Sequence, residues 1–508
     1  MRRGVIAALT GLALAGTLLA APAAPAATTT NSSALRNAVT VNGVMEHEKK
    51  FQQIANRNDG TRVSGTAGFD QSADYVAGRL QAAGYQVSRQ QFDFAFFQEN
   101  ATPQLDQVSP TPTVYQPGVD FSTMDYSGSG NPTAPLVATN DIVIPPGATA
   151  STSNSGCETS DFPANTSGSI VLIQRGTCDF VVKANNAENL GAVGVIIFNE
   201  GQANLGRDGL LLGTLGSPDV SIPVTGTTFA LGEALYNQLQ SGPVTMHMFT
   251  DTTSEIRTTE NVFGVTPGGR ADREVVVGAH LDSVAEGPGI NDNGSGISTI
   301  LEIAEEMSEL GISPVNKVRF AFWGAEESGL IGSEHYVASL SKQQQHNISV
   351  NLNFDMVGSP NFVRFVYDGD GDETGIKGPS GSAQVEDVFL DYFAGRGLET
   401  DPTAFDGRSD YGPFIAVGIP AGGLFTGAEG IKSAAQAAIY GGTAGIAYDP
   451  CYHQACDTID NVNTTAINQM SDATAHATLV FGMTRSDVSG TKGGTGVDTE
   501  FQGSKAKR

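Results

Sequence analysis

Side chains that can bind a metal recur directly after apolar runs in the second half of this 508-residue chain. Three such runs are followed by an imidazole and several carboxylates: His280, Asp282, Glu326, Glu327 and Asp355. A further carboxylate, Asp292, opens a predicted helix, and a second imidazole, His453, lies between two cysteines. Imidazole nitrogens and carboxylate oxygens are common ligands of zinc, so the pattern predicts a zinc site.

Each of these features has an ordinary structural explanation when it is taken alone. A histidine at the end of a strand is commonly a structural residue, and Glu326-Glu327 is compatible with a solvated turn or a helix start. Asn291-Asp292 is compatible with a helix cap. Their coincidence at successive strand ends favours a metal site, because ligands bind beyond the carboxyl ends of the strands in open α/β sheets. We interpret the remaining histidines as structural: His47, His247, His335, His346 and His476.

The elements that position these residues alternate between strands and helices. Apolar runs and alternating patterns predict strands, and amphipathic periodicity predicts helices. The expected strands are 86–96, 274–279, 317–323 and a half-buried strand at 348–354, and the expected helices are 44–55, 70–83, 297–310 and 329–340. This order predicts an α/β fold with a mixed, mainly parallel sheet and helices on both faces.

A second apolar unit without a convincing metal-ligand spacing interrupts this pattern. Its expected elements are strands at 170–173, 193–198 and 221–224 and a helix at 181–190. We expect the metal-site domain at 41–130 and 251–485 and a smaller inserted α/β domain at 131–250. Residues 27–40 and 486–508 are rich in small polar residues, which predicts a disordered or removable leader and a flexible tail.

The N-terminus has the three parts of a secretory signal peptide. Met1-Arg2-Arg3 is basic, Gly4 to Leu19 is apolar, and Ala24-Pro25-Ala26 provides a small-residue cleavage site. A membrane anchor is the weaker alternative, because the run is short and breaks into Ala and Pro. We therefore expect residues 1–26 to be a signal peptide and the protein to be secreted.

The four cysteines are expected to pair, as cysteines of secreted proteins usually do. Four cysteines allow three connectivities, and proximity in the sequence favours Cys157–Cys178 and Cys451–Cys456. Acidic residues outnumber basic ones by 54 to 28, and this excess argues against nucleic-acid binding, because a negative surface repels the phosphate backbone. No later run is apolar enough to span a membrane. We expect a monomer.

Five motifs together carry a family resemblance. They are Gly278–Ser283 (GAHLDS), Gly289–Gly296 (GINDNGSG), Phe322–Leu330 (FWGAEESGL), Asn353–Met356 (NFDM) and Tyr448–Asp457 (YDPCYHQACD). With these motifs, the chain resembles the secreted co-catalytic zinc aminopeptidases of the Streptomyces type over about 40–100 and 255–485. The stretch from about 130 to 250 resembles the protease-associated domain that is often inserted in such peptidases. The resemblance implies a zinc-exopeptidase fold.

The resemblance also implies a set of metal ligands. Asp292 would bridge two zinc ions. One ion would also take His280 and Asp355, and the other would take Glu327 and His453. The same ligands suit cobalt or manganese, so the identity of the native metal stays open.

The resemblance further implies the catalytic roles. Asp282 would fix the tautomer of the neighbouring imidazole. Glu326 would be the general base, and the Tyr452 hydroxyl would face the oxyanion. Glu326 and Asp355 would provide carboxylates for the free α-amino group of the substrate.

The substrate pocket is less well marked. The resemblance implies that the backbone near Gly407 and Arg408 contacts the substrate, and that Phe425 walls an apolar pocket. For Phe425 the alternative is ordinary core packing, and for Arg408 it is a surface salt bridge to Asp406 or Asp410. The substrate would be a peptide or protein N-terminus, with large apolar residues such as Leu favoured.

Two other functions stay open. A related carboxypeptidase or dipeptidase would need a cluster of Arg residues near the metals, and only Arg408 lies beside the motifs. A secreted peptide-binding protein with inactive metal sites would lack a ligand or Glu326, and neither is missing.

An acidic stretch, Asp368–Asp372, resembles a calcium loop. Glu373 stands where an EF-hand requires Gly, and the twelfth position is Pro379 instead of Glu, so we reject an EF-hand. A solvated acidic turn is the favoured interpretation, and calcium remains a possible cofactor without an assigned site.

Overall fold

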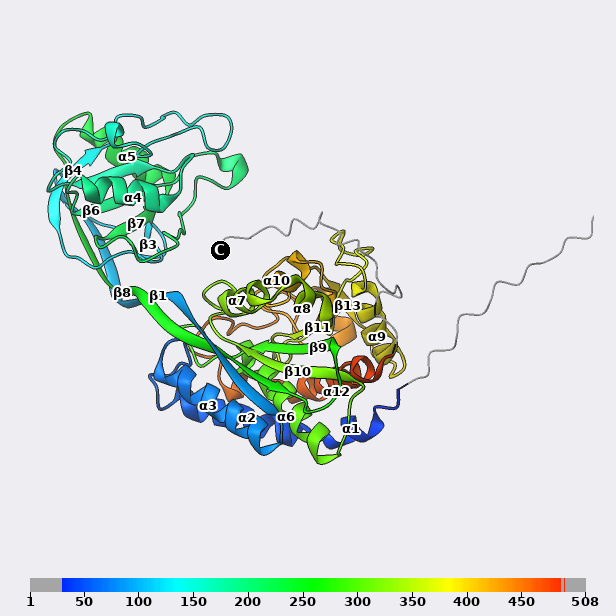
Figure 1. Cartoon of the computed structure of the whole chain (residues 1–508). Coiled ribbons are helices and arrows are strands. Elements are labelled where there is room, and N and C mark those ends of the chain that lie inside the picture. Colours follow the sequence, from blue (N-terminus) through cyan, green and yellow to red (C-terminus); the bar gives the residue numbers. More distant parts are fainter. Residues whose placement is uncertain (1–29, 486–487, 489–508) are drawn as a thin grey trace, which may run out of the picture. The chain divides into compact units, whose positions relative to one another are not determined.

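The computed structural model describes residues 30–485 and 488, and its larger part is built on a mixed β-sheet (Figure 1). The strands of this sheet are β1 (Gln86–Ser109), β8 (Thr245–Val265), β9 (Arg270–His280), β10 (Asn316–Trp323), β11 (Ile348–Phe354), β12 (Phe365–Tyr367), β13 (Asp401–Thr403) and β14 (Ala421–Phe425). They follow the order β13-β12-β14-β11-β9-β10-β8-β1. The strands β14, β11, β9 and β10 are parallel, whereas β8 is antiparallel to β10 and to β1.

Helices cover both faces of this sheet, which confirms the predicted fold class. The helices are α2 (Val41–Ala55), α3 (Ala67–Ala82), α6 (Gly296–Glu309), α7 (Ile331–Ser339), α8 (Lys342–Asn347), α9 (Ser382–Ala394), α10 (Gly412–Ala416), α11 (Ala434–Tyr440) and α12 (Thr464–Met483). The helices α2, α3, α6, α9 and α12 share one buried cluster with Val277 of β9. The neighbouring residue Val276 packs on the other face, in a cluster with α7 and α10.

Two strands differ from the sequence prediction. The strand expected at 348–354 is present as β11, but it is almost wholly buried, because it lies between β9 and β14 and is covered on both faces. The prediction that this strand is half-buried is therefore wrong. β1 continues well beyond the expected end at 96, pairing with β8 as far as Ser109 opposite Thr245. Register irregularities around Ala101 accommodate Pro103, which has no N–H to donate to the neighbouring strand. A proline at this point is typical of the end of a strand, and this is why the sequence predicted an end at 96.

The leader also contains a helix, α1 (Ser33–Ala38), which the composition did not predict. Leu35 and Val39, four residues apart, are buried in the core that α12 helps to form. The Ser32 hydroxyl lies 2.8 Å from Nδ1 of His476. The prediction of a disordered leader is therefore wrong for residues 33–40, because Leu35 and Val39 pack this segment against the core. The expected signal peptide at 1–26 lies outside the described residues, as does the tail at 486–508 apart from residue 488.

The inserted part adds further strands, which join the sheet where β4 (Thr133–Ala138) pairs with the beginning of β8. Its strands are β3 (Phe121–Thr123), β4, β5 (Ile170–Gln174), β6 (Gly194–Phe198) and β7 (Val224–Thr227), and the short β2 (Thr113–Val114) pairs with β1. β4 to β7 are parallel, and β3 is antiparallel to β7. The helices α4 (Phe180–Asn189) and α5 (Phe229–Leu239) pack on opposite faces. The smaller α/β unit expected in this region is therefore present.

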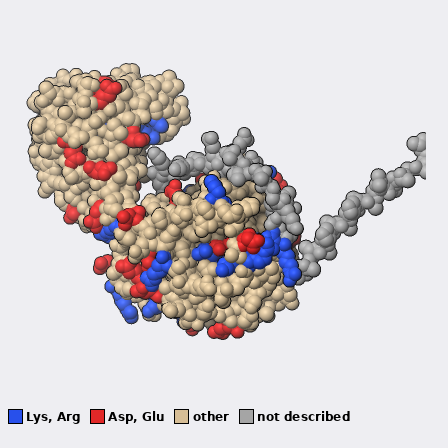
Figure 2. Space-filling view, in the orientation of Figure 1, with Lys and Arg blue, Asp and Glu red and all other residues tan. Residues whose placement is uncertain are grey.

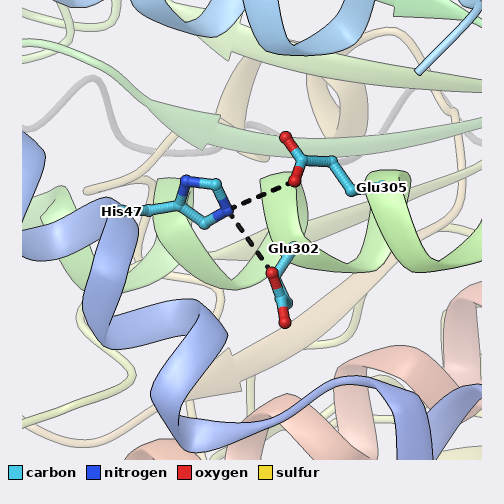
Figure 3. Close-up of side chains that lie close together, drawn as sticks. All are labelled: His47, Glu302 and Glu305. Carbon is cyan, nitrogen blue, oxygen red and sulfur yellow. Dashed lines mark ion pairs between the residues drawn. The ribbon is translucent and has the colours of Figure 1, made fainter. Parts of the chain in front are cut away.

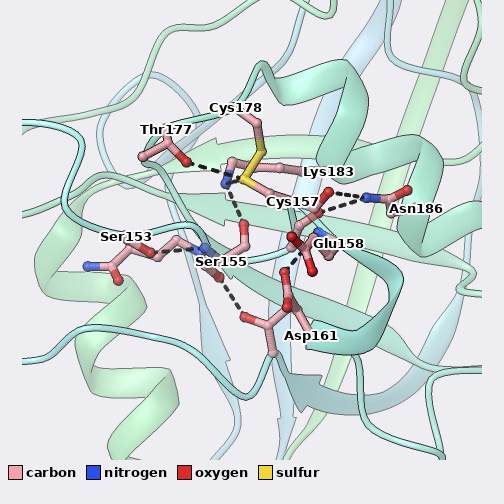
Figure 4. The surroundings of a disulfide bond; sticks show 12 residues. Ser153, Ser155, Cys157, Glu158, Asp161, Thr177, Cys178, Lys183 and Asn186 are labelled. Atoms are coloured by element: carbon pink, nitrogen blue, oxygen red, sulfur yellow. Dashed lines mark hydrogen bonds between the residues drawn. A yellow bond between two sulfur atoms is a disulfide. The ribbon is translucent and has the colours of Figure 1, made fainter.

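Both disulfides join the cysteines that lie near each other in the sequence, Cys157–Cys178 and Cys451–Cys456, as predicted. Buried Lys183 lies beside the first bridge (Figure 4). Its ammonium donates a hydrogen bond to the Ser155 carbonyl and lies 3.7 Å from Cys157 Sγ. Burial lowers the pKa of Lys183 to about 8. The lysine therefore ties α4 to the loop that the disulfide closes.

Charged side chains are spread over the surface in small groups. On the face shown in Figure 2, acidic and basic side chains form separate small groups on the larger part, whereas the inserted part shows mainly acidic ones. None of the helices in the described part is long and apolar enough to cross a membrane.

Candidate active site

Three parallel strands bring the predicted ligands to one edge of the sheet. His280 is the last residue of β9, Glu326 and Glu327 follow β10, and Asp355 follows β11. β9 is paired in parallel with both β10 and β11, so their carboxyl ends lie side by side. These four side chains and Asp292 line one cavity. The convergence that the sequence pattern predicted is therefore present.

Two loops complete this group of ligand atoms. Asp292 lies in the irregular helical turn Ile290–Ser295 that leads into α6. The Asp457 carboxylate fixes this turn by accepting the backbone N–H groups of Asn291 and Asp292, each at 2.9 Å. His453 lies in the loop closed by the second disulfide and has a φ of 54°. Non-glycine residues rarely adopt this conformation, and when they do they are often at functional positions.

Each imidazole of this group faces two carboxylates. His280 Nε2 lies 3.1 Å from Asp292 Oδ1 and 3.3 Å from Asp355 Oδ1. His453 Nε2 lies 3.3 Å from Asp292 Oδ2 and 3.2 Å from Glu327 Oε2. Ligand atoms about 2.0–2.1 Å from a tetrahedral zinc ion lie about 3.3 Å from one another. The donor atoms therefore fit zinc in both type and spacing.

These contacts shift the pKa values of the group. Burial acts to lower the pKa of His280, but the carboxylates around it, Asp355 foremost, raise that pKa well above its ordinary value. Against burial, Asp292 and Glu327 raise the pKa of His453 to about 10. Burial acts to raise the pKa of Asp292, but the two imidazoles hold it far below its usual range. Protons and a metal ion therefore compete for the same nitrogens.

Asp282 supports the group from behind. It accepts the backbone N–H of Glu326 at 3.2 Å and that of Glu327 at 3.3 Å. Its Oδ1 also lies 3.6 Å from His280 Nδ1, the ring nitrogen directed away from the other carboxylates. One carboxylate thus fixes the loop after β10 and faces the imidazole at the end of β9.

Glu326 lies next to the ligand group but outside its shortest contacts. Its Oε2 is 4.0 Å from His280 Nε2, and its Oε1 has no hydrogen-bond partner among the described residues. Burial raises the pKa of Glu326 well above its ordinary value, although His280 acts to lower it. A buried carboxyl that takes up a proton readily and has an oxygen available is suited to acid–base chemistry.

Tyr452 and Arg408 also line the cavity. The Tyr452 hydroxyl accepts a hydrogen bond from Arg408 Nη2 at 3.3 Å. The guanidinium forms an ion pair at 2.7 Å with Glu429. The alternative that predicted a salt bridge for Arg408 named different partners, Asp406 and Asp410; Asp406 instead accepts the Arg408 backbone N–H at 3.0 Å.

Phe425 lines the cavity, and its ring stacks on that of Phe365 with centroids 5.9 Å apart. It therefore packs against a neighbouring side chain and also forms part of the cavity wall. Gly407 is not among the described residues that line the cavity, and its N–H donates to the Tyr411 hydroxyl at 2.9 Å. Met356 lines the cavity and belongs to the NFDM motif, which gave it no role. Four other lining residues carried no signal in the sequence: Tyr367, Thr403, Ala404 and Ala428.

Sequence reasoning also missed two supporting residues. Ser409 Oγ donates to Asp355 Oδ2 at 2.6 Å and so orients this carboxylate. Arg62 is fully buried, and burial lowers its pKa to about 10. Its guanidinium donates to three main-chain carbonyls: Leu281, Pro288 and Gly289. Arg62 thus ties the segment after β9 to the turn that carries Asp292.

The acidic stretch Asp368–Asp372 is a closed turn, so the expected solvated turn is wrong for Asp368. This side chain is buried and accepts the backbone N–H groups of Gly371 at 2.8 Å and Thr374 at 2.6 Å. Glu386 accepts the Gly369 N–H at 2.8 Å. Because the turn itself engages these oxygens, we assign no calcium site here.

Comparison with known proteins agrees with this geometry. Residues 261–478 match Peptidase family M28, and residues 132–235 match the PA domain. The chain is 46% identical over 445 residues to an aminopeptidase of Pseudomonas aeruginosa, covering 87% of this chain and 81% of that protein. It is 40% identical over 456 residues to leucine aminopeptidase 2 of Arthroderma otae, with 89% and 86% covered. The structure of BSAP, a zinc aminopeptidase from Bacillus subtilis, matches with a TM-score of 0.55 and 25% identity over 86% of this chain and 94% of that one.

Proposed function

The chain is a zinc aminopeptidase of peptidase family M28 with an inserted PA domain, and we propose that its active site binds two zinc ions. The observation that carries this proposal is the position of Asp292, whose Oδ1 faces His280 and whose Oδ2 faces His453. Asp355 would complete the protein ligands of one ion and Glu327 those of the other. When bound, the two ions would lower the pKa of a water molecule and polarise the peptide carbonyl.

The side chains around the ligands would carry the proton transfers. Glu326 would take a proton from the attacking water and return it to the leaving amine. Its burial supports this role, because burial makes the carboxyl hold a proton between the two transfers. The Tyr452 hydroxyl would donate to the carbonyl oxygen as this atom gains negative charge. Asp282 would hold the imidazole of His280 and the loop that carries the base.

The cavity supports a preference for a free α-amine and a large apolar side chain such as that of Leu. Asp355 and Glu326 provide negative charge where the ammonium group would lie. Met356, Phe425 and Ala428 provide apolar wall. The name of the Arthroderma relative supports the same side chain.

Secretion is also part of the proposal. The two disulfides support folding in an oxidising compartment, and the N-terminal sequence has the pattern of a signal peptide. We propose a monomer with the metal-site domain at 41–130 and 251–485.

Substrate and metal measurements test these proposals together. We expect cleavage of Leu-p-nitroanilide and no cleavage of the N-acetylated compound, because acetylation removes the amine. We expect the double variant His280→Ala/His453→Ala to bind two fewer zinc ions per chain than the unmodified protein. A difference of one ion would contradict the dinuclear site. Cleavage of both substrates at similar rates would contradict amine recognition.

A further inference from the structure

A second group of possible metal ligands lies between α2 and α6 and shares no residue with the active site (Figure 3). His47 of α2 points between two carboxylates of α6. Its Nε2 lies 3.4 Å from Glu302 Oε2 and 3.9 Å from Glu305 Oε2. His47 is 2% exposed and Glu302 is 6% exposed. The group therefore presents one nitrogen and two carboxylates in a nearly closed space.

The two ring nitrogens of His47 are in different situations. Nδ1 lies 2.7 Å from the Tyr75 hydroxyl oxygen. Nε2 is buried and has no hydrogen-bond partner in the described part of the chain. If Nδ1–H donates to Tyr75, the lone pair of Nε2 points into the gap between the carboxylates, which is the arrangement of a metal-binding histidine. A buried polar atom without a partner is costly, so a ligand that contacts Nε2 would be stabilised here.

Gly43 shows that α2 makes room for the Glu302 carboxylate. A Cβ atom at position 43 would lie only 1.7 Å from Glu302 Oε1. Gly43 lies in the first turn of α2, and glycine is a poorer helix former than alanine, so the absence of a side chain here has a local cost. In return, Glu302 reaches His47 while lying directly against the α2 backbone.

The charges of the group require a cation. Arg79 donates to both carboxylate oxygens of Glu305 and neutralises that side chain. Glu302 accepts no hydrogen bond from the described residues, and the nearby imidazole of His47 is its ion-pair partner. With a neutral imidazole, one buried negative charge is left. A proton on His47 would balance it, and so would a divalent cation that neutralises both carboxylates, because the Arg79 side chain is 46% exposed and its charge is screened by solvent.

We propose that His47, Glu302 and Glu305 bind a structural zinc ion that ties α2 to α6. Imidazole with carboxylates favours zinc over calcium or magnesium, which prefer oxygen ligands alone. The 3.4 Å contact already has the spacing of two ligands on a tetrahedral zinc, and the 3.9 Å contact requires Glu305 to approach by about half an ångström. Because α6 follows directly on the turn that carries Asp292, this ion would anchor the N-terminal helices to the helix behind the active site.

Zinc counting on a matched pair of variants tests the site. Glu302→Gln keeps the size of the side chain and removes its charge, and Glu309→Gln makes the same change at an exposed position of α6. After dialysis against buffered zinc, we expect Glu302→Gln to contain one zinc ion fewer per chain than the unmodified protein. Glu309→Gln should contain the same number as the unmodified protein, and both variants should hydrolyse Leu-p-nitroanilide. An unchanged count in Glu302→Gln would overturn the proposal and leave a protonated His47 as the balancing cation.

Crystals of the unmodified protein provide a test that does not depend on how a variant folds. Crystals equilibrated with 1 mM zinc should give an anomalous peak at the zinc absorption edge between His47 Nε2 and the Glu302 carboxylate. A map with peaks at His280 and His453 and none at His47 would refute the site. The active-site peaks serve as the internal control for zinc loading.

Discussion

Replacing Glu326 by Gln is expected to abolish most turnover and to leave the metal ligands in place. The amide has the size of the carboxyl, and the backbone N–H of residue 326 still donates to Asp282. Glu326 Oε2 lies 4.0 Å from His280 Nε2, whereas the closest contacts of Asp292 and Asp355 with that nitrogen are 3.1 and 3.3 Å. The exchange therefore leaves the shortest contacts of the ligand group unchanged.

The size of the effect follows from the two proton transfers assigned to Glu326. An amide can neither accept the proton of water nor return it to the amine. General acid–base catalysis contributes about 10²–10⁴-fold, which corresponds to about 2.7–5.5 kcal/mol of activation free energy. Because one side chain serves both transfers, we expect kcat to fall by about 10³–10⁴-fold. KM should change little, since the walls of the cavity are unaltered.

The stability of this variant provides a second observable. Burial raises the folded-state pKa of Glu326, so the stability that its protonated form contributes is present at low pH and decreases as pH rises above the unfolded value of 4.5. A neutral amide has no such dependence. Glu326→Gln should therefore be at least as stable as the unmodified protein at neutral pH when both are free of zinc.

Steady-state kinetics, zinc content and thermal unfolding of the variant are measured beside those of Glu334→Gln, which changes an exposed carboxylate on α7 in the same way. The control should have full activity. A kcat within tenfold of the unmodified enzyme, at full zinc content, would refute Glu326 as the base. Loss of zinc together with activity would make Glu326 a ligand instead.

Three further predictions concern other parts of the molecule. The pKa of His453 is raised to about 10, so the ion pairs of its protonated form stabilise the zinc-free protein fully below pH 6.5, and this stabilisation is lost as pH rises through 10. Because zinc must displace the proton, zinc affinity should rise with pH between 6.5 and 10. Calorimetry in buffers of different ionisation enthalpy should detect the proton that is released when zinc binds. Replacing Cys451 and Cys456 by Ser opens the loop that carries His453. The loop-entropy relation gives a stabilisation of about 2 kcal/mol for a disulfide that closes a loop of this length. Equilibrium dialysis of the variant should show weaker zinc binding without loss of the fold. Leu35→Ala creates a cavity under α1 and should lower the free energy of unfolding in urea by about 2–5 kcal/mol; no change would mean that α1 does not contribute to the core.

The principal residues of the ligand group were predictable from the sequence because the fold follows a simple rule. His280 ends β9, Glu327 lies four residues after the end of β10 and Asp355 directly follows β11, and adjacent parallel strands place their carboxyl ends together. Apolar periodicity is sufficient to find such strands, and the candidate ligands lie at the strand end or within four residues after it. The expectation that these side chains converge therefore needed no knowledge of distances.

The supporting residues were not predictable in this way. Arg62 acts through main-chain carbonyls, which every residue has, so no partner residue type marks the contact. Ser409 orients Asp355 through one hydroxyl in a loop that has no period. The helix α1 and the second half of β1 were missed for a related reason, because a single apolar pair, Leu35 and Val39, and a strand with a bulge near Pro103 give weak periodic signals. Contacts between segments distant in the sequence decide all of these positions.

The charge balance of the active site links metal binding to the proton affinity of the base. Among the described residues of this site, the carboxylates of Asp292, Asp355, Glu326 and Glu327 face two imidazoles, His280 and His453. Burial raises the pKa values of Glu326 and Glu327, so the group takes up protons where it lacks cations. Divalent ions bound to the same group would lower the pKa of Glu326 and favour its ionised form, which is the form that accepts a proton. A substitution at any ligand thus changes the proton affinity of Glu326 as well as the metal affinity of the site. The loss of activity in such a variant therefore has two causes, loss of metal and a changed pKa of the base. A zinc count measured beside a pH profile of activity separates them.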